Sequence, residues 1–211
     1  MHLQASNLSL ERGNRRVLEA LSFTVSVGEA LVLTGPNGAG KTTLIRAIAG
    51  FLPVASGSIT LEGGAGDHDI GEQSHFVGHR DGIKGAMTVE ENARFFADYL
   101  GPPRQAAQQS VHAALERLGL AGLSDVPAAW LSAGQRRRLG LSRLLLAKRP
   151  LWLLDEPTVS LDAAAVETLA GMISQHLAAG GIAIAATHVP LGLTNARELR
   201  LGAGRAIEAG A

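Results

Sequence analysis

A run of nine residues, GPNGAGKTT, has the residue types and spacing needed to hold a chain of phosphates. It fits the pattern G-x-x-x-x-G-K-[ST] and comprises Gly35, Pro36, Asn37, Gly38, Ala39, Gly40, Lys41, Thr42 and Thr43. The glycines let the backbone curl so that successive N–H groups point at phosphate oxygens. Lys41 is then expected to reach the β- and γ-phosphates of a nucleotide, and Thr42 to offer its hydroxyl to Mg²⁺. The alternative is a glycine-rich turn that binds nothing.

Two carboxylates follow the apolar residues of LWLLDEPT, at positions 151–158. Ligands collect at the carboxyl ends of strands in open α/β sheets. Asp155 is therefore expected to hold Mg²⁺ through water, and Glu156 to polarise an attacking water as a general base. Two adjacent acids after a strand are commonly a solvated turn, but the phosphate-binding loop favours the nucleotide interpretation.

A third motif lies in LSAGQRRRLGLSRLLLAKRP, where Ser132 and Gln135 have the spacing of a capping box. Ser132 should begin a helix whose free amides, at Ala133 and Gly134, form a second anion-binding end. The alternative is an ordinary capped helix. We expect the arginines that follow, at 136–138, to lie mostly on its solvent-exposed face.

The elements that must position these residues are predicted by hydrophobic pattern. Short apolar runs at 30–34, 151–154 and 181–187 are typical of strands buried on both faces of a parallel sheet. Alternating residues at 21–25 and the segment 58–60 indicate half-buried strands. The phosphate-binding loop thus follows a predicted strand and opens a helix, the context that supports its assignment.

Residues 88–148 have a helical pattern. Thr88 and Glu91 form a capping box, and an amphipathic helix is predicted over 107–118, ending at Gly119. A further helix is predicted before Gly180. The sequence therefore indicates a parallel α/β core interrupted by a helical lobe.

Composition narrows the class of protein. The 211 residues suit one domain with an inserted lobe, and 19 bases balance 19 acids, so no basic field is available for nucleic acid. Cysteine is absent, which excludes disulfides, thiolate metal sites and thiol catalysis. We find no signal peptide and no apolar run of the length that spans a bilayer, and expect a soluble, cytoplasmic chain.

The order of the motifs resembles an ATP-binding-cassette (ABC) nucleotide-binding domain over essentially the whole chain. The resemblance rests on GPNGAGKTT, LSAGQ, LLDEPT, SLD at 160–162 and ATH ending at His188. It implies an α/β fold: a P-loop NTPase (ABC ATPase) core with a parallel sheet, an antiparallel β subdomain and a helical subdomain inserted at about 88–148. Residues 1–211 would form a single nucleotide-binding domain that takes ATP and Mg²⁺.

The same resemblance implies roles for residues. Two copies would form a homodimer that holds each ATP between the P-loop of one and the Ser132 turn of the other. Ser132, Gly134 and Gln135 would belong to that turn, which contacts the γ-phosphate of the partner's ATP. Asp162 would be an inter-subunit loop residue, and His188 a switch histidine that acts with Lys41 and Glu156 in catalysis.

The sequence departs from the common ABC pattern at three positions. Arg12 stands where many of these domains place an aromatic ring on adenine, and its guanidinium can stack on a base by cation–π contact. Ala133 replaces a glycine, adding a methyl group near the phosphate. His79, nine residues before Thr88, occupies the position of the usual glutamine in the loop that leads into the helical lobe.

The segment GHRDGIK at 78–84, with LSAGQRRR, Arg12 and the compact length, resembles the ATP-binding subunits of the cytochrome c maturation system, often called haem exporter ATPases. This implies a peripheral subunit on the cytoplasmic face of the bacterial inner membrane, which supplies energy for c-type cytochrome maturation. Its partners would be a multi-span membrane subunit of the CcmB type and other maturation proteins, with no nucleic acid. His79 as a haem ligand is an alternative; a nucleotide-gated loop is the simpler role.

Two other functions remain open. The chain could serve a different ABC importer or exporter. It could also be a soluble ABC ATPase of translation or DNA repair, although such proteins usually carry two cassettes or a long coiled-coil insertion, and this sequence has neither.

Overall fold

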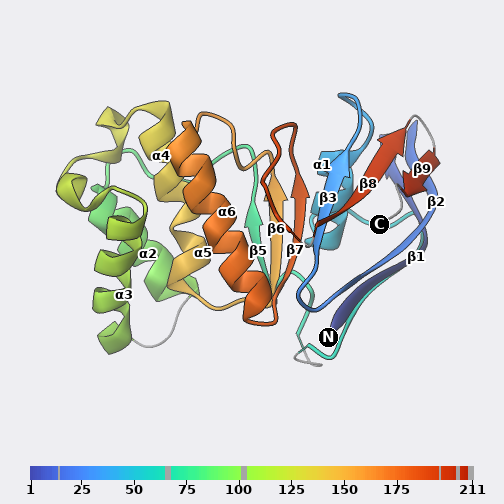
Figure 1. Cartoon of the computed structure of the whole chain (residues 1–211), viewed down its shortest axis with the longest axis horizontal. Helices are drawn as coiled ribbons and strands as arrows, with labels where there is room; N and C mark the ends of the chain where they lie inside the picture. The colour runs from blue at the N-terminus through green and yellow to red at the C-terminus, as the bar shows by residue number, and fades with distance from the viewer. Residues whose placement is uncertain (14, 65–67, 101–103, 195, 203–204, 209–211) are drawn as a thin grey trace. The chain divides into compact units, whose positions relative to one another are not determined.

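The computed structural model describes residues 1–13, 15–64, 68–100, 104–194, 196–202 and 205–208, with side chains for all of these except 104–109 and 205–208 (Figure 1). The chain divides into two compact units. We call them the sheet unit (1–76, 150–157 and 173–211) and the helical unit (77–149 and 158–172).

A six-stranded sheet in the order β5-β6-β7-β3-β8-β9 is the centre of the sheet unit. The pairs β6–β7, β7–β3 and β3–β8 are parallel, and β9 is antiparallel to β8. The strands are β3 (Ala30–Thr34), β5 (Ser74–Val77), β6 (Leu151–Asp155), β7 (Ile182–Ala186), β8 (Ala196–Gly202) and β9 (Arg205–Glu208). Every residue of β6 and β7 is buried, which confirms the prediction from their unbroken apolar runs.

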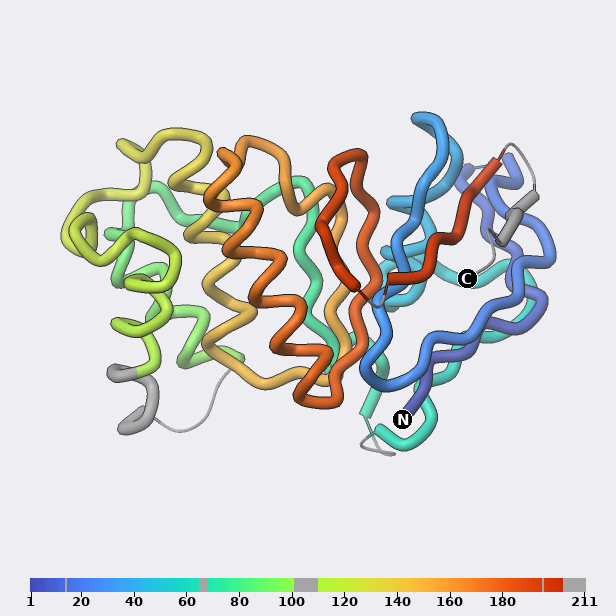
Figure 2. Tube along the Cα trace, in the orientation of Figure 1, coloured from blue at the N-terminus to red at the C-terminus, as the bar shows by residue number. Residues whose placement is uncertain are grey.

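A second, antiparallel sheet has the order β2-β1-β4. It comprises β1 (His2–Arg12), β2 (Arg15–Ser26) and β4 (Ser56–Glu62). Leu21, Phe23 and Val25 of β2 are buried and alternate with exposed residues, as their pattern predicts. The chain can be followed from β3 through the glycine-rich loop into α1 (Lys41–Ile48) in Figure 2. Apolar side chains of both sheets and of α1 form one continuous core.

The helical unit contains α2 (Val89–Leu100), α3 (Arg104–Arg117), α4 (Ala133–Leu141), α5 (Arg143–Leu146) and short 3₁₀ turns at Ala121–Leu123 and Ala128–Trp130. The predicted box at the start of α2 is confirmed, because Glu91 N–H donates to Thr88 Oγ1 (3.1 Å) and Thr88 N–H donates to Glu91 Oε2 (2.8 Å). The longest helix, α6 (Ala163–Ala178), begins in this unit and ends in the sheet unit. Among the residues described, no helix is both long and apolar enough to cross a membrane.

Candidate nucleotide-binding site

The loop between β3 and α1 has a backbone that glycine alone permits. Gly35 has φ +129°, and a Cβ there would lie 2.1 Å from the carbonyl oxygen of Leu201. Gly40, the residue that caps α1, has φ +102°. Both angles lie in the region that side chains disfavour. The glycines of the sequence motif therefore shape a loop that turns directly into a helix N-terminus, as expected for phosphate binding.

Lys41 lies inside this loop. It is 8% exposed, and its Nζ donates to the carbonyl oxygens of Gly35 (2.7 Å) and Pro36 (3.3 Å). These acceptors are neutral dipoles, so the ammonium charge is oriented but not neutralised. The loop thus holds a cation beside the N-terminus of α1, and the two together favour a bound anion.

A hollow of about 910 Å³ opens over the loop. Arg12, Arg15, Arg16, Val17, residues 36–43 and Glu156 line it. None of these lining residues carries an aromatic ring, in agreement with the departure that the sequence indicates at Arg12. Arg15 and Arg16 were not predicted, since only tertiary structure brings the start of β2 to this hollow.

Asp155 ends β6 and is 4% exposed. Its Oδ1 accepts a hydrogen bond of 2.9 Å from Thr42 Oγ1, at the first turn of α1. The structure therefore brings together the two residues predicted from the sequence as magnesium ligands. A hydroxyl and a carboxylate are hard oxygen donors, and Mg²⁺ is commonly held by one or two such groups, with water and phosphate completing the shell. The donor set fits this ion.

Glu156 follows at a sharp change in chain direction, with φ +51°. Its N–H donates to the carbonyl oxygen of Ala186 (2.8 Å), the last residue of β7, which fixes the backbone. Glu156 Oε1 lies 3.4 Å from His188 Nε2. His188 stands in a turn in which Val189 N–H donates to Thr187 Oγ1 (3.0 Å). The predicted base and the predicted switch histidine are thus neighbours.

In the helical unit, the predicted capping box at α4 is confirmed. Gln135 N–H donates to Ser132 Oγ (3.2 Å), and Ser132 N–H donates to Gln135 Oε1 (2.8 Å). A Cβ on Gly134 would lie 2.8 Å from the carbonyl oxygen of Ser160, so this position requires glycine. Asp162 Oδ1 accepts from Ala165 N–H (2.8 Å) and caps α6.

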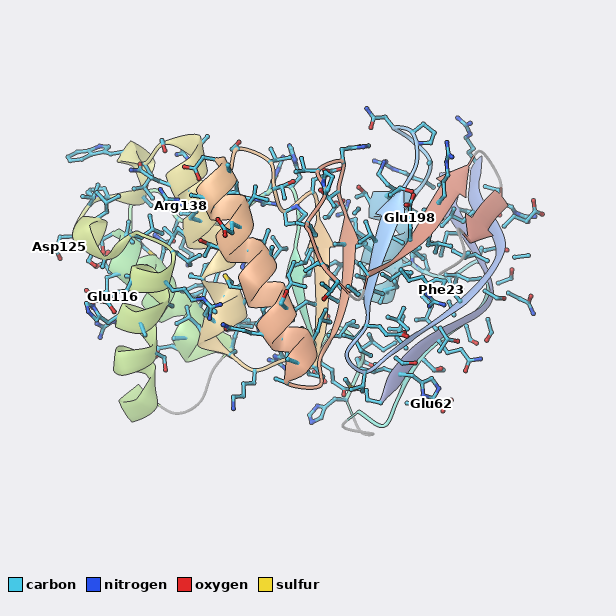
Figure 3. The ribbon with its side chains drawn as sticks, viewed as in Figure 1. Phe23, Glu62, Glu116, Asp125, Arg138 and Glu198 are labelled. Atoms are coloured by element: carbon cyan, nitrogen blue, oxygen red, sulfur yellow. The ribbon has the colours of Figure 1, made fainter. Side chains whose placement is uncertain are left out.

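The expectation that the three arginines of α4 lie mostly in solvent is wrong, because Arg137 is buried and Arg136 and Arg138 are half-buried. Arg137 is 3% exposed and pairs with Asp81, whose Oδ1 lies 2.7 Å from Nη1. Arg138, labelled in Figure 3, donates from Nη1 to the carbonyl oxygen of Leu118 (2.7 Å) near the end of α3. Distant acceptors from the tertiary fold, which local sequence does not reveal, draw these side chains inward.

Arg143 of α5 is a half-buried cation that the sequence motifs did not single out. The pKa of Arg143 is lowered to about 10, mainly by desolvation; the nearby Asp81 carboxylate opposes this change, and the charge of Arg137 adds to it. At neutral pH the guanidinium is still charged. His79, in the same loop as Asp81, is exposed.

A glycine-shaped loop with an enclosed lysine, and a carboxylate bonded to the following threonine, define a P-loop nucleotide-binding protein. The chain belongs to the ABC transporter family, whose model matches residues 18–159. It is accordingly a protein that binds and hydrolyses ATP.

Curated relatives match the chain along almost its whole length. One is "Cytochrome c biogenesis ATP-binding export protein CcmA" of Rhodopseudomonas palustris (strain BisB5), 50% identical over 203 residues, which cover 96% of this chain and 99% of the relative. The protein of the same name from Nitrobacter winogradskyi is 50% identical over 202 residues, covering 96% and 98%.

Solved structures agree in fold. The ATP-binding subunit of an ABC transporter superposes with a TM-score of 0.85 at 24% identity, over 99% of this chain and 90% of that one. The ADP conformation of MJ1267, an ATP-binding cassette of an ABC transporter, gives 0.81 at 23% identity, over 98% and 90%.

Proposed function

We propose that this chain is the ATP-hydrolysing subunit of a membrane ABC complex that supplies energy for the maturation of c-type cytochromes. The observation that carries this is the identity of about half of all residues, over nearly full length, with proteins named for cytochrome c biogenesis. The GHRDGIK sequence at 78–84, which resembles that family, supports the same assignment.

Magnesium would be held by Thr42 and Asp155, and ATP by the loop at 35–43. When bound, Mg²⁺ would neutralise negative charge on the β- and γ-phosphates. Lys41 would exchange its carbonyl acceptors for phosphate oxygens. Asp155, bonded to Thr42 at 2.9 Å, keeps that hydroxyl oriented. Arg12 would stack on adenine in place of an aromatic ring.

Glu156 would act as the general base. It is positioned by its backbone bond to Ala186 and by the turn at φ +51°, and its side chain is 25% exposed, so that water can reach it. His188, 3.4 Å away, would orient the carboxylate and sense the γ-phosphate. A base contributes by taking the proton of the attacking water in the transition state.

The complex would contain two copies of the chain. Ser132, Gly134 and Gln135 of one copy would present the N-terminus of α4 to the γ-phosphate bound by the other. Asp162 would lie at the interface between copies. The free amides at the N-terminus of the capped helix support an approach of phosphate to this end.

The membrane partner would contact the loop that carries His79 and Lys84. Both residues are exposed, and Lys84 Nζ lies 4.2 Å from the centroid of the Phe95 ring. Tyr99, 77% exposed, stacks in parallel on Phe95. A cation over exposed rings is a surface suited to protein docking. In this role His79 would take the place of the usual glutamine near the nucleotide and would not need to bind haem.

Residues 1–211 would act as one nucleotide-binding domain, with a helical subdomain inserted at about 88–148. The compact helical unit, which includes 77–149, supports this division. The partner would be a multi-span membrane subunit of the CcmB type, with other cytochrome c maturation proteins. The chain would bind peripherally at the cytoplasmic face of the inner membrane.

The test is complementation of a bacterium that lacks its own CcmA-type subunit. We expect the chain, expressed with its membrane partner, to restore holo-cytochrome c, and Glu156→Gln not to restore it. Co-purification with the membrane subunit should accompany rescue. Binding to a membrane subunit without any effect on cytochromes would indicate another transporter, and the absence of any membrane partner would indicate a soluble ABC ATPase.

A further inference from the structure

The GHRDGIK loop (residues 78–84) is fastened to the helices of the helical unit from several sides. Arg137 of α4 donates to the carbonyl oxygen of Gly78 (2.8 Å) and to Asp81 Oδ1 (2.7 Å). Asn92 of α2, 2% exposed, accepts from Lys84 N–H (2.8 Å) and donates to Lys84 O (3.0 Å). Backbone groups at both ends of the loop are therefore bonded to side chains of helices.

Arg137 is the decisive contact because its charge is buried. A guanidinium that is 3% exposed must be paired, since an unpaired charge in that position is strongly unfavourable. Asp81 supplies the opposite charge from the loop. The pair joins residues that are 56 positions apart in the chain. Arg137 stands in the same helix that Ser132 caps.

Two further contacts join the loop to α4 and α5. A Cβ on Gly140 of α4 would lie 2.9 Å from Asp81 Cβ, so the helix and the loop touch where a side chain is absent. Arg143 donates to the backbone oxygen of Asp81 and lies 4.4 Å from the centroid of the Phe96 ring of α2. The lowered pKa of Arg143 is consistent with the partial desolvation of its guanidinium in this contact.

We propose that Asp81 and Arg137 are a positioning pair that makes the GHRDGIK loop and the Ser132 helix move as one body. The proposal deepens the proposed function: a membrane subunit that displaces the loop at Lys84 also displaces the helix end that contacts ATP. In this proposal Asp81 and Arg137 act through Lys84 and Ser132, the residues at the ends of the two elements that they join. In some proteins buried ionic groups contribute conformational specificity and not stability, and we assign that role to this pair.

The first test measures, on the purified chain, whether the GHRDGIK loop and the Ser132 helix keep a fixed distance from each other. The sequence contains no cysteine, so spin labels can be placed at Arg80→Cys in the loop and Arg136→Cys in α4 without removing native thiols. Labelled chain diluted with unlabelled chain reports only the distance within one molecule. In a Glu156→Gln background we expect one narrow distance, unchanged when ATP is added.

Adding Asp81→Asn should broaden that distance distribution, whereas Asp125→Asn, an exposed acid of the same unit labelled in Figure 3, should not. The proposal is overturned if the distance distribution is already broad in the chain that keeps Asp81. It is also overturned if the distribution stays narrow in the Asp81→Asn variant. This measurement requires neither the membrane partner nor haem, so it stands apart from the proposed function.

The second test measures coupling in vesicles that contain the membrane subunit. We expect Asp81→Asn to keep the basal ATPase rate of the isolated chain. The partner should stimulate this variant roughly tenfold less than it stimulates the unaltered chain, a factor within the usual range of coupling between sites. Arg137→Gln should behave alike. The double variant, which removes both charges of the pair, should fold and be no worse than the worse single variant.

Additive losses in the double variant would show two independent residues and overturn the pair, as would full stimulation with Asp81→Asn. If a single variant fails to fold, the double variant tests the proposal. Its stimulation by the partner should be reduced if the pair positions the loop, and normal stimulation would overturn the proposal. If the partner does not stimulate the unaltered chain, the proposed function fails. The distances between the spin labels then remain as the test of the Asp81–Arg137 pair.

Discussion

Glu156 and His188 face each other just beyond the carboxyl ends of the neighbouring strands β6 and β7, with Oε1 and Nε2 separated by 3.4 Å. The backbone bond from Glu156 to Ala186 ties the first residue after one strand to the last residue of the other. Parallel pairing thereby places the proposed base and the proposed sensor together, and Asp155 next to Thr42. Five measurements test what this arrangement and its surroundings do.

Lys41→Ala should nearly abolish ATP hydrolysis, because it removes the enclosed charge that the loop directs at the phosphates. ATP turnover by purified protein gives the result. Arg46→Ala, an exposed cation in the last turn of the same helix, is the matched control and should hydrolyse ATP normally. Near-normal turnover by Lys41→Ala would remove the P-loop assignment.

Glu156→Gln should slow hydrolysis by roughly 10² to 10⁴, the usual effect of losing a general base, while ATP binding persists. Because the bound ATP is not hydrolysed, the ATP-bound dimer should then accumulate. Sizing or crosslinking with and without ATP measures this, with Glu167→Gln in α6 as the control. A variant that binds ATP without any gain in dimer would contradict the two-copy arrangement.

Exposed residues of the GHRDGIK loop should matter more for the complex than for basal chemistry. His79→Gln should retain much of the ATPase activity, since both side chains offer a nitrogen that can donate and an atom that can accept a hydrogen bond. His79→Ala and Lys84→Ala should reduce holo-cytochrome yield more than they reduce the basal rate of the isolated chain. If both alanine variants assemble cytochromes normally, the loop is only a surface turn.

Gly134→Ala should lower the free energy of unfolding by about 1 to 3 kcal/mol, the usual cost of overpacking, because its Cβ would lie 2.8 Å from the Ser160 carbonyl oxygen. Ala133→Gly at the exposed neighbouring position should have a much smaller effect. Denaturant unfolding of both variants provides the comparison. Equal stabilities for Gly134→Ala and wild type would show that the Ser160 loop yields easily.

His176 should make stability depend on pH. Its ring stacks on buried Trp152 with centroids 4.1 Å apart, and desolvation lowers the pKa of His176 below its ordinary 6.5. The unfolded chain therefore takes up the proton first as pH falls, so stability is complete above about 6.5 and declines below it, by at most about 1.4 kcal/mol per pH unit.

Unfolding by denaturant at pH 7.5 and pH 5.5 measures this decline. His176→Phe, which can still stack on Trp152, should reduce it, whereas His112→Asn, at an exposed position on α3, should leave it unchanged. A decline that is the same in His176→Phe as in the wild type would assign the pH dependence to other groups.

The elements that depend on neighbours in the chain could be predicted from the sequence alone. The apolar runs at 30–34 and 151–154 indicated strands, of which 151–154 is buried throughout and 30–34 is buried except at Val32 and Thr34. The Ser132 and Thr88 boxes indicated helix starts, because capping is satisfied within four residues. The phosphate loop was predictable for the same reason. Its glycines and lysine are local, and their backbone geometry depends little on the rest of the fold.

Tertiary structure alone decided which distant groups meet. Thr42 and Asp155 are 113 positions apart, and the order of the parallel strands brings them to 2.9 Å. From the sequence alone, that pair could be expected only because each residue belongs to a nucleotide-binding motif. The sequence predicted the opposite for Arg137, because a charged residue in a polar run is normally solvated. Burial depends on what the fold packs over a helix face, and here Asp81 arrives from 56 residues away to compensate the charge.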